Sequence, residues 1–143
     1  TNIQHGSPPC NAGLQRLKAV ERVQSVDECL FIVPKVLLLY LPFDEETCRG
    51  WHLYSVDYCL SAGKFADVLV LPLDLYHRSK GTLSDDYYKT LRKVTRKHSD
   101  HYETIFTTTG IWPTGSWKLR LKFFKDSIIK RLKQWIAFYV LKP

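Results

Sequence analysis

The segment that decides the fold is Trp51-His52-Leu53-Tyr54-Ser55-Val56-Asp57-Tyr58-Cys59-Leu60. Most of its apolar residues return at steps of three and four, which places them on one side of a helix. Gly63 follows, and glycine commonly ends a helix. The sequence therefore predicts a helix over residues 52–62 with its apolar residues largely on one side.

Shorter elements are expected on both sides of this helix. A buried strand, a helix, a turn and two short extended segments are predicted, in this order, at residues 26–33, 35–40, 42–45, 65–71 and 75–77. Pro34 suits the first turn of the short helix, and Pro72 separates the two extended segments. Residues 1–13 are rich in Gly and Pro and have no periodicity, so a loop or a loose arm is expected there.

A further helix is predicted over residues 85–98. Ser84 is a favoured N-cap residue, and Asp85 and Asp86 follow in the first turn. Lysines and arginines occupy the end of this segment. Acidic residues at the start and basic residues at the end match the helix dipole, which supports the prediction.

The last helix is expected to begin near Trp117 and to be amphipathic. Its apolar stripe consists of Leu121, Phe124, Ile128, Leu132, Trp135 and Tyr139, with lysines away from the stripe. Such a helix either packs on its own domain or lies in a membrane interface, where basic flanks and aromatic rings suit the headgroup region. The sequence leaves both alternatives open.

Positive charge is concentrated at the end of the chain. The 143 residues carry a formal net charge of +7, and residues 116–143 hold eight basic residues and one acidic residue, so the part before them is neutral. A hydrophobic share of 45% and a charged share of 24% indicate a folded globule of about one domain. They exclude wholesale disorder and a polytopic membrane protein. A neutral body with a basic end argues for contact between the last helix and an anionic surface.

The four cysteines are expected to be reduced thiols. They are irregularly spaced, without a C-x-x-C pair, and no signal peptide is recognisable. Cys48 and His52 lie one helical turn apart and offer two metal ligands. A structural zinc site needs four ligands and the second pair is missing, so zinc is not expected there.

The order of motifs resembles the C-terminal half of family 2 glycosyltransferases of the GT-A fold. The residues that carry this resemblance are Phe43-Asp44-Glu45, then the segment from Trp51 to Leu60, then Tyr76-His77-Arg78-Ser79-Lys80-Gly81. It covers about residues 25–88. The resemblance implies an α/β fold, namely the acceptor-side half of a GT-A domain. It also implies transfer, with inversion, of a sugar from a nucleotide-sugar donor to a glycan or lipid-linked acceptor.

Two departures from this family limit what can be carried over. The family's N-terminal half, with nucleotide-binding strands and a D-x-D-like motif, has no room in this chain. The chain is therefore expected to be a fragment or split product, or to be completed by another chain. In addition, Ser55 stands where many family members have the acidic residue taken as the catalytic base, which leaves Asp57 as the nearest carboxylate.

The chemistry of sugar transfer assigns roles to these residues. A carboxylate must take a proton from the acceptor hydroxyl, and a divalent cation must neutralise the leaving diphosphate. Asp57 is expected to be the base. The resemblance implies that His77 is a ligand of Mn²⁺ or Mg²⁺, and that Asp57 and His77 face a common cleft. The residues expected to bind substrate are Trp51, His52, Asp44 and Glu45.

Each assignment has a plainer alternative. Asp57 can cap or pair within its own helix, and His77 can be a surface loop histidine. Trp51 can pack in the core. Asp44 and Glu45 can hold their turn through backbone N–H groups instead of touching substrate.

The expected organisation is an arm or linker over residues 1–24, the glycosyltransferase half over 25–115 and the basic amphipathic helix over 116–143. The isolated chain is expected to be inactive. The alternative function is a non-catalytic remnant or interaction module that docks through its last helix. RNA binding is a third hypothesis, but no nucleic-acid motif is present. No apolar run approaches the roughly 20 residues of a spanning helix, so a cytoplasmic location is expected, with peripheral membrane contact through the last helix.

Overall fold

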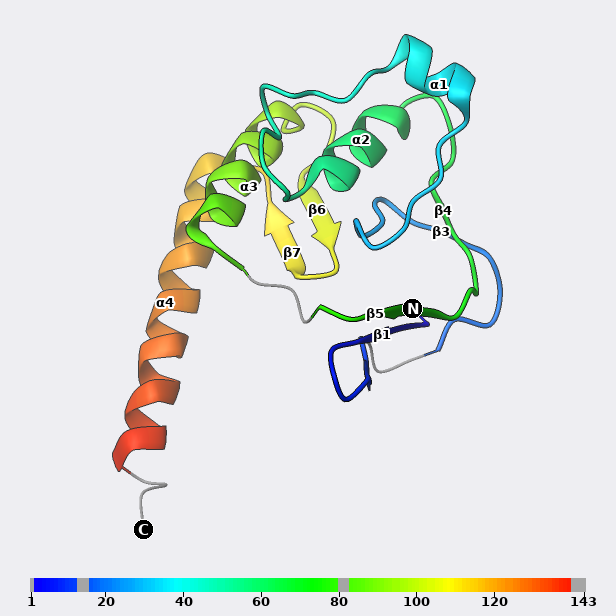
Figure 1. The fold of residues 1–143 in the computed structure, drawn as a ribbon. Helices are drawn as coiled ribbons and strands as arrows, with labels where there is room; N and C mark the ends of the chain where they lie inside the picture. The colour runs from blue at the N-terminus through cyan, green and yellow to red at the C-terminus, as the bar shows by residue number, and fades with distance from the viewer. Residues whose placement is uncertain (1, 13–15, 80–82, 140–143) are drawn as a thin grey trace.

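The computed structural model describes residues 2–12, 16–79 and 83–139, which form a small mixed α/β fold with four helices and three small sheets (Figure 1). In chain order the elements are β1 Ile3–His5, β2 Cys10–Asn11, β3 Glu21–Arg22, α1 Lys35–Tyr40, α2 Tyr54–Ala62, β4 Leu69–Val70, β5 Leu75–His77, α3 Asp85–Lys97, β6 Thr104–Thr107, β7 Gly110–Pro113 and α4 Ser116–Tyr139. The sheets have the orders β2-β1-β5, β3-β4 and β6-β7.

The hydrophobic core lies between α2, α3, the β6–β7 hairpin and the start of α4. Its buried members are Leu53, Val56, Leu60, Tyr87, Leu91, Val94, Ile105, Trp112 and Leu119. All of them follow residue 52. In the described part of the chain before that point, no hydrophobic side chain belongs to the buried core. The body of the domain is therefore built by residues 53–119.

Helix α2 confirms the helix predicted over residues 52–62, with a start two residues later. The later start follows from Leu53, which has a left-handed backbone with φ of 65°. For a residue other than glycine this conformation costs on the order of 1 kcal/mol. Two contacts of Leu53 offset this cost: its N–H donates to Glu28 Oε1 at 2.5 Å, and its side chain is buried in the core. Gly63 caps the end of α2 as predicted.

Three other predicted elements, α1, β5 and α3, are also confirmed. Ser84 is the N-cap of α3, and its Oγ accepts a hydrogen bond from the N–H of Tyr87. Acidic residues occupy the first turn of α3 and basic residues the last, as the dipole argument requires. Helix α3, which contributes Tyr87, Leu91 and Val94 to the core, therefore follows closely from local sequence signals.

The strand predicted over residues 26–33 is wrong. This segment forms turns and irregular backbone, and Asp27 Oδ1 accepts the N–H of Cys29 at 3.0 Å. Local side-chain bonds of this kind compete with sheet formation. The strand predicted over residues 65–71 is reduced to β4, because β3 pairs with only two of its residues.

The sequence predicts a loop or a loose arm over residues 1–13, but the described residues 2–12 contain the two strands β1 and β2. Strand β1 pairs in parallel with β5, and β2 pairs with β1 in antiparallel fashion. The two partners β1 and β5 are separated by about 70 residues, so no local pattern in either segment announces the pairing. The consequence is that the start of the chain lies beside the predicted site residue His77.

Helix α4 confirms the predicted C-terminal helix and leaves the body of the domain (Figure 1). Leu119 is 6% exposed and Phe123 packs against the core, whereas every described side chain from Phe124 onward is exposed. The side chains of Trp135 and Tyr139, which the sequence adds to the apolar stripe, lie outside the described residues. Among the helices of the described residues, none has the length and apolar character to cross a membrane.

Candidate functional site

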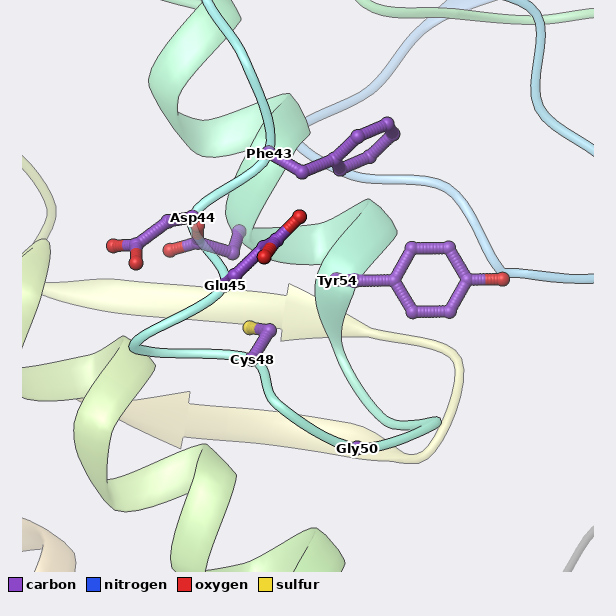
Figure 2. Close-up of a pocket in the computed structure, with 7 residues that line it drawn as sticks. Phe43, Asp44, Glu45, Cys48, Gly50 and Tyr54 are labelled. Atoms are coloured by element: carbon purple, nitrogen blue, oxygen red, sulfur yellow. The ribbon is translucent and has the colours of Figure 1, made fainter.

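A cavity of about 280 Å³ opens beside the first turn of α2 (Figure 2). It is lined by Phe43, Asp44, Glu45, Cys48, Gly50, Tyr54 and Asp57. These residues come from α2 and from the loop that connects α1 to α2. Three of the six candidate site residues, Asp44, Glu45 and Asp57, therefore meet at one cavity.

Asp57 supplies a buried carboxylate to this cavity. It is 3% exposed and lies in the first turn of α2. Its Oδ2 accepts a hydrogen bond from Lys97 Nζ at 2.7 Å, and its Oδ1 accepts one from His98 Nε2 at 2.8 Å. Both partners stand at the C-terminal end of α3. Asp57 therefore pairs with the end of α3 and not with a residue of its own helix.

Lys97 joins two acidic residues of the cavity, because its Nζ also donates to Asp44 Oδ2 at 2.7 Å. This hydrogen bond holds the pKa of Asp44 well below its usual range. Partial burial opposes the charge on Lys97, but the hydrogen bonds to the two acidic side chains raise its pKa overall. Lys97, which does not itself line the cavity, therefore keeps a positive charge between Asp44 and Asp57.

Asp44 also holds the loop that forms the cavity. Its Oδ1 accepts the N–H groups of Glu46 at 3.0 Å and Thr47 at 2.9 Å, which is the turn-holding role considered from the sequence. Glu45, the next residue, is exposed. Asp44 is thus a structural anchor that also lines the cavity, and Glu45 lines the cavity as an exposed residue.

Two aromatic rings, Phe43 and Tyr54, form the apolar part of the wall. Their centroids are 6.2 Å apart, and Phe43 also packs on Tyr58 at 4.9 Å. The wall contains one thiol, Cys48. Burial raises the pKa of Cys48 to about 12, and the nearby Asp57 adds to the effect. A thiol that stays protonated is a poor nucleophile.

Trp51 and His52 do not line the cavity. Trp51 is 89% exposed, so the alternative that it packs in the core is wrong. Its neighbour Gly50 does line the cavity, but Trp51 itself does not. His52 Nε2 lies 3.2 Å from Ser84 Oγ, and its ring packs edge to face on Tyr87. His52 therefore supports the start of α3 instead of reaching toward a substrate.

His77 lies in a different cluster from Asp57. It stands on β5 opposite His5 of β1, with ring centroids 5.6 Å apart. One ligand atom from each of His5, Cys29 and His77 lies within 4.8 Å of the other two. His77 is not among the residues that line the cavity, so the structure does not bring Asp57 and His77 to one cleft.

The donor atoms around His77 do not fit the Mg²⁺ or Mn²⁺ that the resemblance implies. Both ions prefer oxygen ligands. The cluster instead offers two imidazoles and one thiol. In addition, Nδ1 of His5 and Nδ1 of His77 are buried and have no hydrogen-bond partner among the described residues. No step of a transfer reaction is therefore assigned to a metal at His77.

Sequence reasoning missed the residues that surround Asp57 and His77. Lys97 and His98 are about 40 positions away from Asp57 in the sequence, and only the packing of α3 on α2 brings them near. The sequence predicts a loop or a loose arm at His5 and a strand at Cys29, and it gives neither residue a role. The helix predicted over residues 85–98 contains Lys97 and His98, but the sequence alone does not indicate that this helix packs on α2.

Comparison of the chain with protein-family models, with curated protein sequences and with solved structures found no match.

Proposed function

We propose that this chain is the acceptor-side half of a family 2 glycosyltransferase of the GT-A fold, in which Asp57 is the catalytic base. The observation that supports this proposal is the position of Asp57. Its buried carboxylate reaches the wall of a cavity that also presents Asp44, Glu45 and two aromatic rings. Such a wall combines an apolar surface with a few polar groups, as ligand sites commonly do.

The composition of the wall suits a sugar. Carboxylates accept hydrogen bonds from hydroxyl groups, and the rings of Phe43 and Tyr54 offer flat apolar faces to the C–H side of a pyranose. Each oxygen of Asp57 accepts one hydrogen bond from the protein, which leaves one lone pair on each for a substrate hydroxyl. The acceptor O–H donates to Asp57, and the proton passes to the carboxylate as the oxygen bonds to the anomeric carbon of the donor sugar. The diphosphate departs with the electron pair of the broken bond.

The nucleotide-sugar donor has to be held by residues other than those described here. Sugar binding and sugar transfer can therefore be tested separately. In the binding test, a panel of mono- and oligosaccharides is screened against the chain by saturation-transfer NMR. We expect an acceptor to bind, and Tyr54→Ala to weaken it at least about tenfold, as loss of a packed ring contact does. Tyr40→Ala, an exposed tyrosine on α1, is the matched control.

In the transfer test, the nucleotide-binding half of a family 2 glycosyltransferase is fused before residue 25. We expect transfer to the acceptor found in the binding test, and a rate about 10²- to 10⁴-fold lower in Asp57→Asn, because this change removes the base and keeps its shape. The 143 residues alone should not turn over a nucleotide sugar. Turnover by the chain alone, or equal rates with and without Asp57, would contradict the proposal.

A second candidate function is contact with an anionic membrane surface through α4. The observation that favours it is the exposed second half of this helix. Its exposed apolar residues are Phe124, Ile128, Ile129, Leu132 and Ile136. Its exposed basic residues are Lys125, Lys130, Arg131 and Lys133. Basic residues near an anionic surface contribute about 1 kcal/mol each, and salt attenuates this contribution.

Vesicle co-sedimentation tests this second function. We expect the chain to sediment with phosphatidylserine vesicles at low salt and to be released at high salt. A chain that ends at Lys125 keeps Leu119 and Phe123, so it should fold and remain in the supernatant. Binding that survives this truncation, with an unchanged circular dichroism spectrum of the body, would exclude the membrane role of α4.

A further inference from the structure

Three ligand-bearing residues from distant parts of the chain meet at the edge of the β2-β1-β5 sheet. They are His5 on β1, Cys29 in the loop before α1 and His77 on β5. The parallel pairing of β1 with β5 sets His5 directly opposite His77. In the part of the chain that the structure describes, this is the one cluster of at least three histidine, cysteine or acidic side chains close enough to share an ion.

We propose that His5, Cys29 and His77 bind a zinc ion, with a water molecule as the fourth ligand, and that this ion fastens the N-terminal segment and the loop before α1 onto β5. This site is separate from the proposed transfer reaction and stands or falls without it. Imidazole nitrogen and thiolate sulfur are the ligands that Zn²⁺ prefers, whereas Mg²⁺ and Mn²⁺ prefer oxygen. The two imidazole nitrogens and the thiolate sulfur therefore favour Zn²⁺ over Mg²⁺ and Mn²⁺.

The geometry is close to that of a zinc site. Bonds of about 2.0–2.3 Å in a tetrahedron place ligand atoms about 3.3–3.6 Å apart. The three ligand atoms here lie within 4.8 Å of one another, so side-chain movements of about 1 Å close the site. The Nδ1 atoms of His5 and His77 are buried and lack a protein partner among the described residues. A metal ion supplies the partner that these two nitrogens otherwise lack.

A neighbouring carboxylate balances the charge of such a site. Two neutral imidazoles and one thiolate leave a net charge of +1 on bound Zn²⁺. Asp27 accepts the N–H of Cys29 at 3.0 Å and the hydroxyl of Thr108 at 2.7 Å, and it interacts electrostatically with His5. Asp27 is therefore held next to the ligands, where its negative charge offsets the remaining positive charge.

The N-terminal third of the chain needs such a fastening. None of the described residues before Leu53 contributes a hydrophobic side chain to the buried core. Helix α1 has no buried residue, and β1, β2 and β3 have two or three residues each. Segments that cannot bury enough apolar surface are commonly held by disulfides or metals, and the four cysteines here are free thiols.

Metal titration of the whole chain tests the proposal. With a chromophoric chelator as competitor, we expect one equivalent of Zn²⁺ to bind, and Mg²⁺ and Mn²⁺ to bind far more weakly. Co²⁺ in place of Zn²⁺ should give the thiolate-to-metal charge-transfer band. His5→Gln, Cys29→Ser and His77→Gln should each lower the Zn²⁺ affinity at least about tenfold, because even the loss of an outer-shell partner has that effect.

Two control variants carry the same substitutions at residues outside the cluster. Cys48 lies at the Asp57 cavity and His101 lies on the surface. The variants Cys48→Ser and His101→Gln should therefore bind Zn²⁺ like the unaltered chain. A second measurement needs no variant: Zn²⁺ should protect Cys29 from alkylation while the exposed Cys10 reacts, as mass spectrometry of peptides shows. Absence of stoichiometric binding, equal losses in the controls, or alkylation of Cys29 at its metal-free rate would each overturn the zinc site.

Discussion

At the scale of single residues, Lys97 decides how Asp57 and Asp44 can coexist at one cavity. Two acidic side chains at one wall repel each other unless a positive charge lies between them. Lys97 Nζ donates to both at 2.7 Å and so joins α3, α2 and the loop before α2. The cavity therefore depends on a residue that does not line it.

Replacement of this lysine gives the first prediction. In Lys97→Met the buried Asp57 keeps only His98 as a partner, and an under-satisfied buried acceptor costs about 1–3 kcal/mol. We expect the free energy of unfolding, measured by urea denaturation, to fall by about this amount. Lys89→Met, an exposed lysine on the same helix, should change it little. Equal effects of the two variants would show that the bridge contributes nothing to stability.

Glu28 carries the second prediction, which concerns pH. Burial raises the pKa of Glu28, and the neighbouring Asp27 raises it further, although Oε1 accepts the N–H of Leu53. The folded protein therefore holds this proton more tightly than the unfolded chain. Above the raised pKa, the buried charge of Glu28 lowers the free energy of unfolding. This destabilisation disappears as the pH falls below the ordinary pKa of 4.5.

Glu28→Gln keeps the acceptor and removes the charge. We expect it to raise the unfolding free energy at neutral pH, and the gain to vanish in acid. Glu21→Gln, which is exposed on β3, should show no such pH-dependent gain. The measurement is chemical denaturation at a series of pH values, and a gain that persists unchanged into acid would contradict the assignment.

At the scale of elements, α4 contains two different environments on one helix. Leu119 is buried, whereas Leu132 is 55% exposed. The sequence predicted the helix and its apolar stripe but left open whether the stripe packs on the domain or faces something else. In the structure the described members of the stripe, Leu121, Phe124, Ile128 and Leu132, are all exposed. The residues of α4 that pack on the domain are Leu119 and Phe123, which the stripe did not include.

Two identical substitutions in α4 test this division. Leu119→Ala should lower the unfolding free energy by about 2–5 kcal/mol, since it leaves a cavity in the core. Leu132→Ala should stay within about 0.5 kcal/mol, as surface substitutions do. Both variants change leucine to alanine in the same helix, so helix propensity cancels between them. Similar losses in urea denaturation would mean that the far half of α4 is also packed.

The elements that could be predicted are those with a local cause. Ser84 as N-cap, Gly63 as a helix stop and the spacing of apolar residues fixed α2, α3 and α4 within a few positions. The β6–β7 hairpin was missed. Its strands flank Thr108 and Thr109, and the second strand begins at Gly110, whose φ of 152° suits glycine; the sequence analysis did not use this short turn signal. The pairing of β1 with β5 had no local signal at all.

The same distinction holds for the candidate site. Asp44, Glu45 and Asp57 were predicted and meet at the cavity, because one loop and one helix carry all three. Trp51 and His52 are close to Asp57 in sequence but do not line the cavity, since Trp51 is exposed and His52 packs on Tyr87. Sequence proximity therefore places residues near a site but does not decide which of them face it.

At the scale of the whole molecule, stability should be distributed unevenly along the chain. The core is formed by residues 53–119, and the described residues before them bury no hydrophobic side chain in it. In amide hydrogen exchange we expect Val56 to Leu60 and Leu91 to Val94 to exchange most slowly, near the global unfolding limit. Amides of α1 and β1 should exchange faster by orders of magnitude. Uniform protection along the chain would contradict a core limited to the C-terminal part.

The exposed half of α4 also has a mechanical consequence. Residues 124–139 extend about 24 Å at 1.5 Å per residue, and only the first turns of the helix are attached. Lys122 lies over the Trp112 ring at 4.9 Å, and Phe123 packs on the same ring at 5.8 Å. The helix is thus attached to the domain at Trp112, and residues 124–139 project from this attachment. A sideways force on the exposed end of α4 is transmitted first to Trp112. It therefore strains the β6–β7 hairpin before it reaches α2.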